Sequence, residues 1–119
     1  MKKILVIEDN ENNLYLSRFI LEKSGYKVIE ARDGVSGVEK AIKEKPDLAI
    51  MDIQLPNING LEATKRIRAS EADHNVPIIA LTYYAMTGDR EKALAAGCTG
   101  YIEKPINPET FMAEIERYL

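Results

Sequence analysis

Three carboxylates, one hydroxyl and one ammonium group come directly after short apolar segments of this sequence. In chain order they belong to Glu8, Asp9, Asp52, Thr82 and Lys104. The clearest case is Asp52, which follows the apolar residues 48–51 and precedes a proline and two asparagines. A charge at the end of a buried segment is unfavourable unless a partner offsets it. These residues are therefore candidates for a functional site.

The residue types suit the chemistry of a phosphoryl group. Carboxylates placed together repel one another unless a cation lies among them, and carboxylates with backbone carbonyls and water are the ligands that Mg²⁺ prefers. A carboxylate such as Asp52 can also act as a nucleophile and form an aspartyl-phosphate. Mg²⁺ and Lys104 would then neutralise the phosphoryl oxygens, and the Thr82 hydroxyl would donate a hydrogen bond to one of them.

Alternating segments of the chain must position these side chains. Five short runs rich in Ile and Val predict β-strands, at residues 4–7, 27–31, 48–51, 77–81 and 100–103. Four stripes with helical spacing separate or follow them, at Leu14, Ser17 and Leu21; Val35, Val38 and Ile42; Leu61, Thr64 and Ile67; and Phe111, Ile115 and Leu119. Gly25 and Gly97 are predicted to end the first and fourth helices, and Asn107 with Pro108 to begin the fifth.

This alternation predicts an α/β fold of five βα units, (βα)5, with helices on both faces of the sheet. The expected form is a doubly wound, flavodoxin-like three-layer sandwich whose five-stranded parallel sheet has the order 2-1-3-4-5. Ligands of such sheets bind outside the carboxyl ends of the strands, where the strand order reverses. That point lies between the first and third strands, so Asp9 and Asp52 would flank it.

Composition excludes several functional classes. The net charge of −3 argues against nonspecific nucleic-acid binding, which needs a basic face. No apolar run approaches the roughly 20 residues of a membrane span. The single Cys98 cannot form an internal disulfide, so a reducing, cytoplasmic setting is the simplest expectation.

Five motifs make the sequence resemble the receiver domain of two-component response regulators over essentially its whole length. They are VIEDN (6–10), MDIQLPNINGLEA (51–63), ALT (80–82), AAG (95–97) and GYIEKPI (100–106). The resemblance implies that residues 1–119 form a response regulatory (receiver) domain that accepts phosphate from a histidine kinase or a histidine phosphotransfer protein. It also implies a protein that takes part in its own phosphorylation and dephosphorylation without being an enzyme.

The resemblance assigns roles to the residues at the predicted site. Asp52 is the expected phosphoacceptor. Glu8, Asp9, Asp52 and the backbone carbonyl of Gln54 are the expected ligands of Mg²⁺, with Mn²⁺ as a substitute. Lys104 is the expected cation beside the phosphoryl group.

The same resemblance implies a switch. Thr82 would move toward the phosphoryl group, and Tyr101 would turn inward into the space vacated. The face made by the fourth helix, the fifth strand and the fifth helix would change shape, and a downstream protein would read it. The bond between Lys104 and Pro105 is expected to be cis, as is typical of the family.

Two aromatic residues depart from the family pattern. Tyr83 stands where the family usually has a small residue after the switch threonine, and Tyr84 follows it. A ring at Tyr83 would crowd the phosphoryl group or alter its access to water. We therefore expect Tyr83→Ala to change the dephosphorylation rate. His74, the only histidine, is expected to be an exposed loop residue.

Three other functions are alternatives to a phosphoaccepting receiver domain. A flavodoxin would need a phosphate-binding loop after the first strand, but the segment EDNENN is acidic. A Mg²⁺-dependent phosphatase working through an aspartyl-phosphate would carry a second Asp at the position of Gln54. A binding module that never sees phosphate would not need the set Asp9, Asp52, Thr82 and Lys104.

The context of the domain stays open between two kinds of receiver. It resembles both DivK-like stand-alone regulators and receivers of hybrid kinases. We expect a monomer or weak dimer that does not itself bind nucleic acid or a membrane. The sequence does not identify the kinase, the downstream partner or the pathway.

Overall fold

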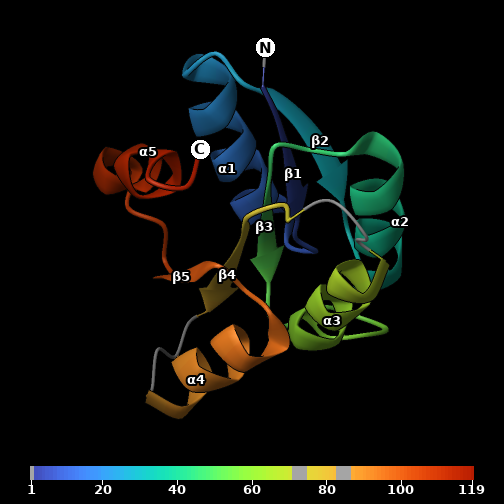
Figure 1. Cartoon of the computed structure of the whole chain (residues 1–119). Helices are drawn as coiled ribbons and strands as arrows, with labels where there is room; N and C mark the ends of the chain where they lie inside the picture. The colour runs from blue at the N-terminus through green and yellow to red at the C-terminus, as the bar shows by residue number, and fades with distance from the viewer. Residues whose placement is uncertain (1, 71–74, 83–86) are drawn as a thin grey trace.

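The computed structural model of the chain describes residues 2–70, 75–82 and 87–119, leaving out the side chains of residues 87–89. His74, Tyr83 and Tyr84 lie outside the described residues, so the predictions made for them stay predictions. Strands and helices alternate along the chain (Figure 1), as β1 (Lys3–Ile7), α1 (Glu11–Lys23), β2 (Lys27–Ala31), α2 (Gly34–Glu44), β3 (Leu48–Asp52), α3 (Gly60–Ser70), β4 (Ile78–Thr82), α4 (Thr87–Ala96), β5 (Gly100–Glu103) and α5 (Pro108–Glu116).

The strands form one parallel sheet in the order β2-β1-β3-β4-β5, which confirms the predicted fold and strand order. Its register places Ile7 beside Met51, Asp52 beside Leu81, and Thr82 beside Glu103. The carboxyl ends of β1, β3, β4 and β5 therefore lie along one edge of the sheet. This alignment brings the candidate residues together although they are far apart in the sequence.

Helices cover both faces of the sheet (Figure 1). Helices α1 and α5 pack on one face through a core that includes Leu14, Leu21, Phe111 and Ile115. Helices α2, α3 and α4 pack on the other face through small residues such as Ala93. The central strands are buried on both faces, which explains why their sequences do not alternate between apolar and polar residues.

The predicted helix ends agree with the structure. Gly25 and Gly97 have φ angles of 93° and 112°, a left-handed conformation in which glycine carries no Cβ penalty. Asn107 caps α5, where its side chain accepts a hydrogen bond from the backbone N–H of Glu109, and Pro108 lies in the first turn.

The prediction for α2 was right about the helix and only partly right about its buried face. Val38 packs against the core as predicted. Val35 and Ile42 are instead 39% and 48% exposed, whereas Gly34, Gly37 and Ala41 face the core. The reason is close packing, because a Cβ on Gly37 would lie only 2.7 Å from Cδ1 of Ile7. Larger residues on that face would hold the helix away from β1.

Candidate functional site

Buried opposite charges meet at the carboxyl edge of the sheet. The ammonium Nζ of Lys104 lies 2.9 Å from Oε1 of Glu8 and 3.1 Å from Oδ2 of Asp52. The three residues are only 7%, 1% and 5% exposed, respectively. A buried ammonium group between two carboxylates offsets part of the cost of burying them.

The turn between β1 and α1 fixes the first acidic pair. The backbone N–H of Glu8 donates to the carbonyl of Ala31 at 2.9 Å, which extends the β1–β2 pairing past the end of the strand. The backbone N–H of Asn10 donates to Oε2 of Glu8 at 3.3 Å, and the Asn10 side chain caps α1 by accepting from Asn13. Asp9, held between Glu8 and this cap, is exposed toward solvent.

The loop after β3 holds Asp52 from the opposite side. The backbone N–H of Gln54 donates to Oδ1 of Asp52 at 3.1 Å, so both carboxylate oxygens of Asp52 have partners. The N–H of Gly60 donates to the carbonyl of Ile53 at 2.8 Å. A Cβ at Gly60 would lie 2.4 Å from the carbonyl oxygen of Asp52, so only glycine lets α3 begin this close to the strand.

Lys104 directly follows strand β5 and lies at the same edge of the sheet. Its backbone N–H donates to the carbonyl of Thr82 at 2.7 Å, which continues the pairing of β4 with β5. The peptide bond between Lys104 and Pro105 is cis, the isomer that the family resemblance implies.

The acidic residues are arranged as metal ligands would be. Carboxylate oxygens of Glu8, Asp9 and Asp52 lie within 4.8 Å of one another. They open onto a cleft of about 420 Å³ that Gln54 also lines. Oxygen ligands and a partly open site match the few-ligand coordination of Mg²⁺, so the residues present fit this ion. The part assigned to the Gln54 carbonyl stays a prediction.

Electrostatics at the site favour an added cation. Burial, followed by the hydrogen bond and the charge of Asp52, raises the pKa of Glu8 to about 7 despite the opposing effect of Lys104. Burial alone would lower the pKa of Lys104, but its contacts with Glu8 and Asp52 outweigh burial and raise it. Two carboxylates therefore share one ammonium group, a negative excess that a divalent cation would relieve.

The predicted switch residues lie beside a small cavity. Thr82 and Tyr101 line a space of about 120 Å³ together with Ala80 and Ala93. Tyr101 is half-buried, and the guanidinium carbon of Arg90 lies 5.3 Å from the centre of its ring. The sequence interpretation missed both the cavity and Arg90. The small residues Ala80 of β4 and Ala93 of α4, which both line it, are the local signal for the cavity.

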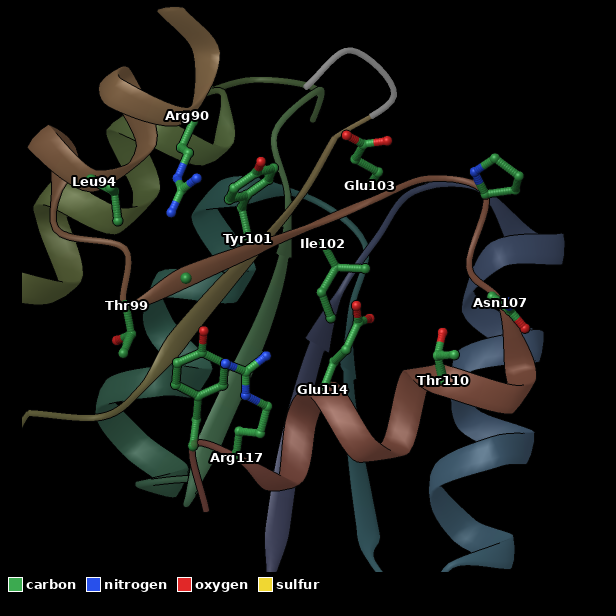
Figure 2. Close-up of a pocket in the computed structure, with 13 residues that line it drawn as sticks. Arg90, Leu94, Thr99, Tyr101, Ile102, Glu103, Asn107, Thr110, Glu114 and Arg117 are labelled. Atoms are coloured by element: carbon green, nitrogen blue, oxygen red, sulfur yellow. The ribbon is translucent and has the colours of Figure 1, made fainter. Parts of the chain in front are cut away.

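A second hollow marks the face predicted to contact a partner. Figure 2 shows a groove of about 490 Å³ bordered by α4, β5 and α5. Arg90 and Leu94 enter it from α4, Tyr101 from β5, and Glu114 and Arg117 from the α5 side. The groove is therefore mixed in charge, with apolar and aromatic side chains between the charged groups.

The chain matches known proteins along nearly all its length. Residues 4–116 match the family described as response regulator receiver domain. The polar-differentiation response regulator DivK of Brucella anthropi is 42% identical over 118 residues, covering 99% of this chain and 96% of that protein. The DivK protein of Brucella ovis is 43% identical over the same shares of the two chains.

Solved structures agree with this match. Chemotaxis protein CheY4 of Vibrio cholerae superposes with a TM-score of 0.94 at 32% identity, covering 100% of this chain and 99% of that one. The receiver domain of a sensor histidine kinase from Pseudomonas aeruginosa gives a TM-score of 0.90 at 38% identity, covering 98% and 96%. That domain was crystallised with a magnesium ion coordinated in its active site cleft.

Proposed function

The chain belongs to the response regulator receiver family and is DivK-like, and on that premise we propose that it is a Mg²⁺-dependent phosphoacceptor of a phosphorelay. Asp52 accepts the phosphoryl group from a histidine kinase or a histidine phosphotransfer protein. The observation that carries the proposal is the cluster of Glu8, Asp9 and Asp52, whose carboxylates fit one cation and two of which, Glu8 and Asp52, also pair with Lys104.

The chain's own residues supply most of the chemistry. In the proposed transfer, a carboxylate oxygen of Asp52 bonds to phosphorus, the P–N bond of the phosphohistidine breaks, and its electron pair stays on the imidazole nitrogen. Lys104 is already within 3.1 Å of Asp52 and would neutralise a phosphoryl oxygen without reorganisation. Glu8, Asp9, Asp52 and the Gln54 carbonyl would hold Mg²⁺, which supplies further charge neutralisation when bound.

The switch in this proposal uses the small cavity. Thr82 moves toward the phosphoryl group, and the Tyr101 ring enters the space that both residues line. The groove between α4, β5 and α5 then changes shape, because Tyr101 also lines that groove. A downstream protein distinguishes the two shapes by its different affinity for them.

We propose a cytoplasmic, monomeric or weakly dimeric regulator that acts by protein contacts and is not an enzyme with a substrate of its own. In the described part of the chain, no helix combines the length and apolarity needed to cross a bilayer. Turnover as a phosphatase is disfavoured because Gln54 stands where such enzymes place a second Asp for acid–base work.

Acetyl phosphate tests the phosphoacceptor role directly. The wild-type protein with Mg²⁺ and acetyl phosphate should gain the mass of one phosphoryl group, and EDTA should abolish the gain. Asp52→Asn should gain nothing, and Asp9→Asn should gain it far more slowly because a metal ligand is lost. A gain of equal size in Asp52→Asn would place the acceptor elsewhere and contradict the proposal.

A further inference from the structure

One aromatic side chain lines both the groove and the small cavity described above. Among the residues that the structure describes, Tyr101 alone lines both the groove between α4, β5 and α5 and the small cavity beside Thr82. In the present structure its ring lies under the guanidinium group of Arg90, 5.3 Å from ring centre to guanidinium carbon. Figure 2 shows Arg90 extending from α4 toward this ring.

Arg90 approaches the Tyr101 ring from the groove. Arg90 lines the groove and not the cavity, whereas its near neighbour Lys92 lines the cavity and not the groove. A guanidinium group within about 6 Å of a ring centre is attracted to the ring face by its quadrupole. We call the present position of the Tyr101 ring, beside Arg90, the outward position. A ring that moves into the cavity leaves this cation, so the attraction favours the outward position alone.

We propose that Arg90 is a positioning residue that holds Tyr101 in the outward position and so sets the threshold of the switch. The inference rests on the proposed function, because it assumes that Tyr101 moves inward when Asp52 is phosphorylated. A ligand shifts such an equilibrium only by its differential affinity for the two states. Arg90 binds its aromatic partner in one state only, as an intramolecular ligand would.

The expected effect is modest and measurable. Cation–π contacts at exposed sites correspond to about a two- to fivefold change in an equilibrium constant. Removing Arg90 should therefore raise the inward population of Tyr101 by about two- to fivefold in the unphosphorylated protein. By linkage, a phosphoryl mimic that favours the inward state should bind more tightly by up to the same factor.

The test uses the full chain with beryllium trifluoride and Mg²⁺ as the phosphoryl mimic. The variants are Arg90→Met, which keeps the aliphatic stem, and Arg90→Lys, which restores a cation. Arg117→Met is the matched control, because Arg117 lines the same groove without a cation–π contact to any ring in the described part of the chain. Two readouts are needed, namely the Tyr101 side-chain rotamer population by NMR without the mimic and the apparent affinity for the mimic.

Arg90→Met should increase the inward population of Tyr101 and the affinity for the mimic about two- to fivefold. Arg90→Lys should restore most of the wild-type behaviour. Arg117→Met should change neither the population nor the affinity. In a Tyr101→Leu background, Arg90→Met should no longer alter the affinity. Unchanged rotamers in Arg90→Met, or an equal effect in the Tyr101→Leu background, would overturn the inference. Failure of the wild-type protein to bind the mimic would instead count against the proposed function, and the rotamer measurement would still decide the contact.

Discussion

The two helical layers pack on the sheet with side chains of different size. Among the described residues, the buried core beneath α1 and α5 consists of branched aliphatic residues and Phe111. The core beneath α2, α3 and α4 contains six alanines and Cys98 among larger residues. Large interdigitating side chains fill space and resist movement, whereas small ones allow close approach and leave room for a ring. The layer built from small residues is the one that holds the proposed switch.

The largest difference between the layers should appear when a large side chain is removed. Phe111 lies on the buried face of α5 and is fully buried. We expect Phe111→Ala to lower the free energy of unfolding by about 3–5 kcal/mol, because it loses buried apolar area and leaves a cavity. Urea unfolding measures this change. Phe111→Leu is the control and should lose less, since it keeps more of the buried volume.

Phosphorylation provides the second half of that measurement. Under conditions in which Phe111→Ala remains folded, its rate of phosphorylation by acetyl phosphate should stay near the wild-type rate, because Phe111 is not a residue of the acidic cleft. A large loss of phosphorylation in folded Phe111→Ala would show that the α1/α5 layer is coupled to the site. The proposed separation between the layer packed with large side chains and the layer that holds the switch would then be wrong.

Sequence patterns predicted the fold and the acidic site because both depend on local rules. Buried parallel strands have continuous apolar sequences, and the carboxyl ends of such strands align at one edge. This reasoning located Glu8, Asp52 and Lys104 at one place, and the structure brings their charged groups within hydrogen-bonding distance.

The same patterns failed where packing distance decides the outcome. On α2 they selected the large residues Val35 and Ile42, although Gly37 faces the core because β1 comes so close. They also gave no sign that Arg90 of α4 covers Tyr101 of β5. The offset of a helix against an edge strand is set by tertiary packing, and no periodicity within either segment encodes it.

Close packing of α2 provides the second prediction. Gly37→Ala should improve helix propensity by up to about 1 kcal/mol, but the new Cβ would lie within 3.0 Å of three atoms of Ile7. Overpacking of this kind costs about 1–3 kcal/mol, so we expect a net loss of stability in urea unfolding.

A double-mutant cycle sharpens this prediction. Ile7→Val removes Cδ1, the atom that comes nearest to the new Cβ. The double variant Gly37→Ala with Ile7→Val should be more stable than the sum of the two single effects predicts. Additive effects would show that α2 moves away freely, and the close-packed description of this layer would fail.

The smallest effect on stability should accompany a large effect on switching. Ala93 is buried on α4 and lines the cavity of about 120 Å³ beside Thr82 and Tyr101. Leu is a strong helix former, and its extra carbons can occupy the existing cavity. We therefore expect Ala93→Leu to lower the free energy of unfolding by no more than the low end of the about 1–3 kcal/mol that overpacking a filled core costs. Because the added side chain occupies the space for the Tyr101 ring, phosphorylation should no longer move that ring, as NMR of Tyr101 would detect.

Phosphorylation of Asp52 itself should persist, since Ala93 does not line the acidic cleft. Full movement of the Tyr101 ring in a stable, phosphorylated Ala93→Leu protein would mean that the ring uses another space, and the small-residue layer would lose its proposed role in the switch.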